Sequence, residues 1–122
     1  MRRSPLPPLL AGLLVTAVAG CGSTTRVGGD RTVRVALTEY RVTPQDVRAG
    51  AGLLTIVVHN DGRLTHNLVI LSGGVTEASS KPIPPGQTED VEAVLAPGKY
   101  LMASRIQSDQ ALGAYGTLDV GS

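Results

Sequence analysis

Apolar and polar side chains alternate with a period of two along much of the chain after residue 31. In Thr32–Leu37, the side chains of Val33, Val35 and Leu37 would share one face, and Leu53–Asn60 is rich in β-branched residues. A period of two predicts strands with one buried face. No segment has the 3.6-residue period of an amphipathic helix. The pattern therefore predicts an all-β domain.

Further strands are expected wherever short apolar runs lie between turn residues. They are Glu39–Val42 and Val47–Arg48 on either side of Pro44, then Asn67–Leu71, Thr76–Ser80, Thr88–Leu95, Lys99–Ser104 and Tyr115–Val120. Gly, Pro and Asn-Asp-Gly turns separate these segments. Short strands with such punctuation are typical of a β-sandwich, here of about seven or eight strands within residues 32–122.

The first 31 residues have a different pattern. A basic start, Met1-Arg2-Arg3, precedes an apolar run over 9–19, and Val18-Ala19-Gly20-Cys21 follows. This order predicts a signal peptide over residues 1–20, and its last four residues resemble the lipobox of bacterial lipoproteins. In such precursors the cysteine is lipidated, for example with palmitate, and becomes the new N-terminus. An ordinary signal peptide is the alternative, and the choice between general and twin-arginine export stays open.

A lipidated Cys21 predicts attachment to the extracytoplasmic face of the cell membrane. Residues 21–31 would then be the lipidated cysteine and a flexible tether of small polar residues. The apolar run is shorter than the ~20 residues that span a bilayer. Cys21 is the single cysteine, so no disulfide can form within one chain.

Charge adds one exclusion. Loss of residues 1–20 removes Arg2 and Arg3, which leaves nine basic against ten acidic side chains in the remainder. These charges are scattered, and no basic patch predicts a nucleic-acid partner.

Three blocks in the expected domain resemble the cupredoxins, the small blue-copper proteins. They are Ala36–Gly50 with its Glu-Tyr-Arg-Val-Thr-Pro segment, Val58–Ile70 with Asn-Asp-Gly and His-Asn, and Leu95–Leu118 with Ala-Pro-Gly-Lys-Tyr and Gly-Thr-Leu. The resemblance covers nearly all of the chain after residue 31, and the order and spacing of the three blocks make it specific. The resemblance implies a Greek-key β-sandwich of the plastocyanin and azurin type.

The resemblance also identifies four positions where the family places its copper ligands. His66 matches the first histidine, whereas Ser104, Asp109 and Ala114 stand where the cysteine, the second histidine and the methionine would be. A blue-copper site needs a thiolate and two imidazoles. A serine hydroxyl is a hard donor and alanine offers none. We therefore expect no type 1 copper and no electron transfer.

The remaining polar residues at these positions allow three roles. The first is a hydrogen-bonded cluster that fills the metal cavity, with Asp109 or Ser104 bonded to the His66 ring and the pKa of His66 raised by Asp109. The second is a weak Zn²⁺ or Cu²⁺ site using His66 with Asp109. The third is a Ser/His/Asp hydrolase, but the sequence shows neither a nucleophile elbow nor an oxyanion hole. We expect the first, with no bound cofactor and no enzyme activity.

Two other residues are expected to have no role at a metal. Alternation along its strand places His59 on the solvent side, and Met102 points toward the core. The sequence thus favours a lipid-anchored binding module whose partner is an envelope protein or component. Its contact surface would lie over Arg63–His66 and Gln107–Gln110. The alternative is a copper- or zinc-handling lipoprotein.

Overall fold

The computed structural model describes residues 24–121, and within them the chain forms ten β-strands and no helix. The strands are β1 (Thr25–Arg26), β2 (Thr32–Thr38), β3 (Arg41–Thr43), β4 (Asp46–Gly50), β5 (Gly52–Asn60), β6 (Val69–Ser72), β7 (Val75–Ser79), β8 (Thr88–Leu95), β9 (Gly98–Ala103) and β10 (Tyr115–Gly121). The all-β prediction is confirmed.

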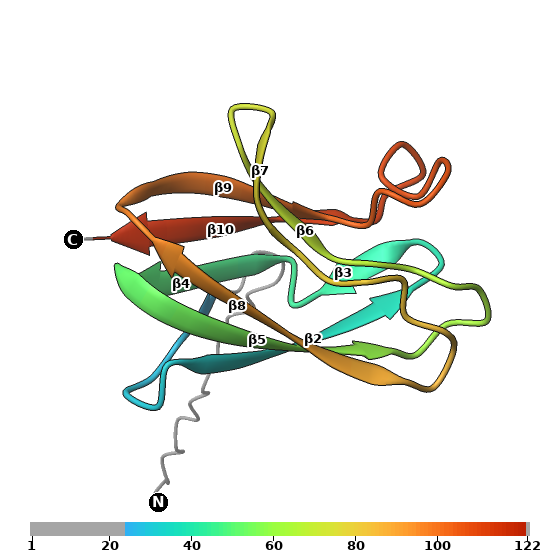
Figure 1. Ribbon diagram of the computed structural model, residues 1–122, viewed down its shortest axis with the longest axis horizontal. Coiled ribbons are helices and arrows are strands. Elements are labelled where there is room, and N and C mark those ends of the chain that lie inside the picture. The colour runs from blue at the N-terminus through green and yellow to red at the C-terminus, as the bar shows by residue number, and fades with distance from the viewer. Residues whose placement is uncertain (1–23, 122) are drawn as a thin grey trace, which may run out of the picture.

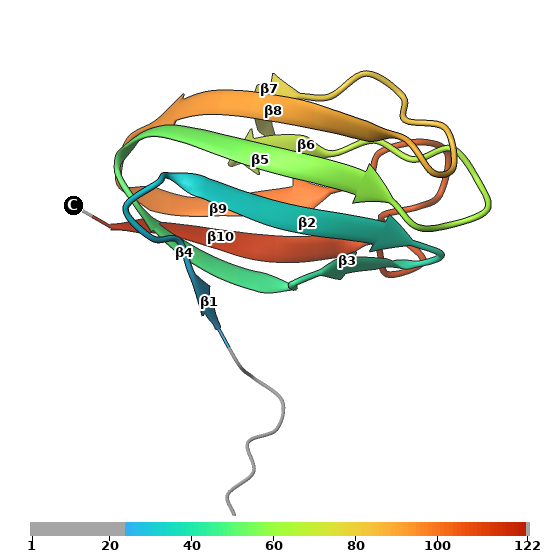
Figure 2. The same ribbon diagram turned by 90° about the horizontal axis from the view of Figure 1, so that it is seen from below.

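The strands form two sheets packed face to face, as Figures 1 and 2 show from two directions. One sheet has the order β1-β4-β10-β9-β6-β7 and the other β3-β2-β5-β8. Both sheets are mixed, because β2 pairs with β5 and β4 pairs with β10 in parallel while most neighbours are antiparallel. The expected β-sandwich is therefore present.

The core lies between the two sheets and is built by the predicted alternation. In β2 every second residue is buried, and β5 and β8 bury alternate residues in the same way. The fully buried side chains include Leu37, Leu54, Ile56, Val58, Ile70, Ile83, Met102 and Leu118. Among the residues that the structure describes, Tyr100 is the buried tyrosine of this core, and its hydroxyl donates to the carbonyl of Ala96 at 2.7 Å. Branched aliphatic side chains fill this core without Phe or Trp.

The strand count and the tether differ from the sequence predictions. β1 lies inside residues 21–31, where we expected a flexible tether, and it pairs in parallel with β4. Val27 packs against the main core, which explains why this segment is held on the sheet. The segment Glu39–Val42 starts later than predicted, as the short β3. The predicted signal peptide and Cys21 lie outside the described residues.

The β2–β3, β5–β6 and β9–β10 connections lie at one end of the sandwich, on the right in Figure 1. Parallel pairing of Leu37 with Asn60 places the ends of β2 and β5 side by side. The β9–β10 connection, residues 104–114, leaves from Ala103, which pairs with both Val69 and Tyr115. The connection after β5 therefore runs beside this hairpin loop. Within residues 24–121 no helix is long and apolar enough to cross a membrane.

Candidate functional site: a buried histidine between two carboxylates

His66 is held in the connection between β5 and β6 by its own backbone. Its N–H donates to the carbonyl of Ile83 at 3.2 Å, and its carbonyl accepts from the N–H of Ile83 at 2.7 Å. These two hydrogen bonds hold the His66 backbone against that of Ile83, and the His66 side chain has no exposed surface. Tyr40 contacts the ring edge-on, with centroids 6.4 Å apart.

Each nitrogen of the His66 ring faces a carboxylate. Nδ1 lies 2.7 Å from Oδ2 of Asp109, and Nε2 lies 2.5 Å from Oε2 of Glu39. An ionised carboxylate can only accept, so a ring that bonds to two of them must carry a hydrogen on both nitrogens. The arrangement therefore selects the imidazolium form of His66.

Ser104 completes the buried cluster from the end of β9. Its hydroxyl donates to Oδ2 of Asp109 at 2.6 Å and accepts from the backbone N–H of Asn67 at 3.2 Å. The Asn67 side-chain carbonyl accepts from the N–H of Arg105 at 2.8 Å. Oδ2 of Asp109 is thus the point on which Ser104 and His66 converge. The expected bond between Asp109 and the His66 ring is present.

Glu39, from the β2–β3 connection, is held by backbone amides of the next loop. Its carboxylate accepts from Arg63 N–H at 3.0 Å and from Leu64 N–H at 3.1 Å. Asn60, which is fully buried, shapes that loop: its side chain donates to the Leu64 carbonyl at 2.8 Å and accepts from the Gly62 N–H at 2.8 Å. The predicted Asn-Asp-Gly turn therefore positions the amides that bind Glu39.

The environment shifts two acid–base equilibria. Burial disfavours a charged ring and by itself lowers the pKa of His66, but the hydrogen bonds of Asp109 and then Glu39 outweigh it, so the pKa is raised above 6.5. The hydrogen bond from Arg63 N–H, followed by that with His66, lowers the pKa of Glu39 from 4.5 to about 2. Both shifts favour an imidazolium between two carboxylates.

The residues present do not fit the copper site that the sequence resemblance implies. Both His66 nitrogens are committed to hydrogen bonds, so neither offers a lone pair to a metal. Ser104, at the position where the resemblance places the thiolate, offers a hydroxyl. Ala114 is buried beside it, accepts from the Ser104 N–H at 3.0 Å through its carbonyl, and offers no side-chain donor. A type 1 centre needs imidazole and thiolate donors. Within the described part of the chain, no cluster of three or more His, Cys, Asp or Glu side chains is arranged to hold a metal.

The hydrogen bonds also differ from those of a hydrolytic triad. In a triad the histidine lies between the serine and the aspartate and accepts the serine proton. Here Asp109 lies between Ser104 and His66, because the Ser104 hydroxyl donates to the carboxylate. Every buried side-chain N and O in residues 24–121 has a hydrogen-bond partner. The cluster is a closed, fully satisfied network.

Met102 and His59 lie on the sides of their strands that the alternation predicts. Met102 is fully buried, as predicted. His59 is partly exposed and contacts Thr88 Oγ1 and Asp61, on the opposite side of β5 from the buried Val58. The prediction for the contact surface was wrong for two residues, since His66 is fully buried and Asp109 only 6% exposed. They lie beneath that face because they bond to each other.

Glu39 is the site residue that sequence reasoning missed. The only signal was its place just after a strand that pairs in parallel with β5, which brings it to the end where the His66 loop begins. That signal requires knowledge of the strand pairing.

Sequence and structure comparisons agree on the relationship. The sequence model of the cupredoxin-like domain family matches residues 10–114. No curated protein sequence is significantly similar to the chain.

Three solved structures illustrate the fold. Auracyanin from Roseiflexus castenholzii is 21% identical, with 78% of this chain and 100% of that chain covered and a TM-score of 0.72. Auracyanin A from Chloroflexus aurantiacus, described as a "blue" copper protein, is 19% identical (79% and 99% covered, TM-score 0.68). An azurin from Methylomonas sp. strain J is 12% identical (75% and 98% covered, TM-score 0.64). At these identities the likeness shows the shared fold. On the match over residues 10–114, the chain belongs to the cupredoxin-like domain family.

Proposed function

We propose that this protein is a lipid-anchored, extracytoplasmic cupredoxin-like module that binds a partner and does not transfer electrons. The observation that carries the proposal is the commitment of both His66 nitrogens to Asp109 and Glu39. A histidine used in this way ties loops together instead of presenting a ligand to copper. We further propose that the protein is not an enzyme and holds no resident cofactor.

The binding surface in this proposal is the end of the sandwich above His66. The two loops joined by the His66–Asp109 bond each present a leucine to solvent: Leu64 is 52% and Leu112 is 57% exposed. The network beneath fixes both loops, so these side chains are preorganised, which lowers the entropic cost of binding. An envelope protein is the partner that this surface and a membrane anchor would serve.

Photo-crosslinking in intact cells would test the binding role. A photoreactive residue at Leu64 or Leu112 is expected to give a discrete crosslinked product, and one at Val75, which is 63% exposed on β7, is not. Equal crosslinking from Val75, or none from either loop position, would contradict a specific partner on this face.

The alternative, a copper- or zinc-handling lipoprotein that uses His66 with Asp109, is separated by metal titration. Under the proposal, Cu²⁺ gives no intense visible band, and calorimetry gives the same weak Cu²⁺ and Zn²⁺ binding for the wild type and His66→Gln. Tight binding that His66→Gln abolishes would favour the alternative.

A further inference from the structure

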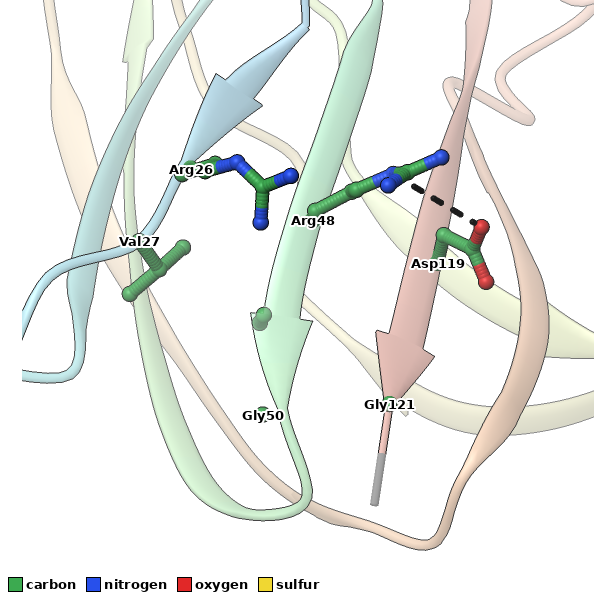
Figure 3. A pocket seen from close by; sticks show the side chains of 7 residues that line it. Arg26, Val27, Arg48, Gly50, Asp119 and Gly121 are labelled. Atoms are coloured by element: carbon green, nitrogen blue, oxygen red, sulfur yellow. Dashed lines mark ion pairs between the residues drawn. The ribbon is translucent and has the colours of Figure 1, made fainter.

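A second feature lies at the other end of the sandwich from His66. A surface pocket of about 420 Å³ is formed on the six-stranded sheet where β1, β4 and β10 run side by side (Figure 3). Arg26, Arg48 and Asp119 line it, together with Gly50 and Gly121 near the strand ends. A Cβ at Gly121 would meet no atom within 4 Å, so the floor of the pocket is open to an incoming group.

The pocket carries an excess of positive charge. Arg26 and Arg48 are direct partners in the parallel β1–β4 register, and like charges in that position repel. Asp119 Oδ2 lies 4.0 Å from Arg48 Nε but also 3.4 Å from Lys99 Nζ. One carboxylate therefore serves two cations. Arg26 forms no ion pair with any residue of the described chain, and Figure 3 shows its guanidinium directed toward Arg48.

A third arginine is fixed beside the pocket. The Arg31 guanidinium donates to the carbonyl of Gly50 at 2.8 Å and to that of Leu53 at 3.1 Å. These bonds hold the guanidinium in place, and no carboxylate of the described residues forms an ion pair with it. Arg31 therefore adds to the positive potential at this end.

Exposed apolar side chains lie at the same end on the other sheet. Leu53 is 53% and Val94 is 77% exposed, and the two are cross-strand partners in the β5–β8 register. Cationic and apolar side chains together are typical of a surface that rests on a lipid interface.

We propose that this end of the domain docks on the membrane surface, with the phosphate of an anionic phospholipid bound between Arg26 and Arg48. Arginine pairs with phosphate through two parallel N–H donors, and such a ligand would relieve the repulsion between the two side chains. The proposal rests on the proposed lipid anchor at Cys21, which would hold this end of the domain close to the membrane. Arg26 follows Cys21 by five positions, so the chain between them spans at most about 18 Å.

This orientation has a consequence for the His66 end. A domain that rests on the membrane through Arg26 and Arg48 presents Leu64 and Leu112 away from the lipid. The partner surface would then face outward.

Vesicle co-sedimentation tests the docking without the anchor. The chain starting at residue 21 and carrying Cys21→Ser would be mixed with phosphatidylglycerol or phosphatidylcholine vesicles at low salt. We expect preference for the anionic vesicles, lost at high salt, and a roughly 25-fold weaker partition for Arg26→Gln/Arg48→Gln, at about 5-fold for each arginine. Arg63→Gln/Arg105→Gln is the matched control, with the same charge loss at the opposite end. Circular dichroism checks that each variant is folded.

Three outcomes would overturn the proposal. They are equal binding to both vesicle types, equal losses for the two double variants, and inorganic phosphate perturbing the Arg48 side-chain signals in NMR while vesicles do not bind. The last would assign the pocket to a free phosphate. The assayed protein carries no lipid, so a negative vesicle result would contradict the docking proposal alone. The lipid anchor is tested separately, by fractionation of Cys21→Ala.

Discussion

Asp109 and His66, 43 positions apart in the chain, are joined by a 2.7 Å hydrogen bond between Oδ2 and Nδ1 in the buried end of the sandwich. The bond connects the β9–β10 loop to the loop between β5 and β6, and Glu39 ties the β2–β3 connection to the opposite nitrogen of the same ring. One imidazolium therefore holds three loops together.

The first prediction concerns the protonation of His66. Asp109→Asn and Glu39→Gln should each lower the pKa of His66, because each removes a carboxylate that favours the charged ring. NMR titration of the ring protons measures this directly. The ring signals of His59, the only other histidine, serve as an internal reference in the same spectra. If neither substitution changes the pKa of His66, the ring is not an imidazolium held between the Asp109 and Glu39 carboxylates.

The second prediction is the pH dependence of stability. The raised pKa of His66 gives stabilisation that is complete below about 6.5 and is lost as pH rises through the folded value. Glu39 has a lowered pKa, so its stabilisation is present above 4.5 and is lost as pH falls toward about 2. Urea denaturation across pH should show both losses. His66→Gln should flatten the upper one, and an unchanged slope there would contradict the assignment.

The third prediction uses Gly62. A Cβ at this position would overlap the Glu39 carboxylate, which could move aside only by giving up its bonds to Arg63, Leu64 and His66. Gly62→Ala should therefore lower the free energy of unfolding, because these hydrogen bonds are left unmade, and should also lower the His66 pKa. Gly29→Ala, where a Cβ meets nothing within 4 Å, is the control. Combined with Glu39→Ala, the Gly62→Ala cost should largely disappear, and simple additivity would mean that Gly62 acts elsewhere.

The fourth prediction tests whether the four positions keep the frame of a copper site. Ser104→Cys, Asp109→His and Ala114→Met together would supply a thiolate, a second imidazole and a thioether around His66. This triple variant should develop intense visible absorption with Cu²⁺. The variant that leaves Ser104 in place should not, because the colour comes from the thiolate. A colourless triple variant with a native circular dichroism spectrum would show that these four positions do not have the spatial arrangement of copper ligands.

The fifth prediction addresses the anchor. Cys21→Ala should move the protein from the membrane fraction to the soluble fraction, whereas Ser23→Ala should not. Retention of Cys21→Ala in the membrane fraction after a high-salt wash, which removes binding through surface charges, would exclude lipidation as the means of attachment.

The pattern of apolar and polar residues predicts the β-sandwich and most of its strands. Alternation in Thr32–Leu37 and Thr88–Leu95 selects the buried faces, because a strand sends successive side chains to opposite sides and apolar ones gain by leaving water. The alternation is a local signal, visible in a few neighbouring residues. His66, Ser104, Asp109 and Ala114 were identified as one set only through the resemblance of three separate blocks to the cupredoxins.

The hydrogen bonds of these four residues depend on contacts between segments that are distant in the chain. Glu39 reaches His66 through the parallel pairing of β2 with β5, and β1 pairs with β4 across more than twenty positions. Such contacts depend on which strands become neighbours, and no periodicity within a segment specifies that. The protonation of His66 depends in turn on two carboxylates brought from distant loops, because charge interactions act through space and not along the chain.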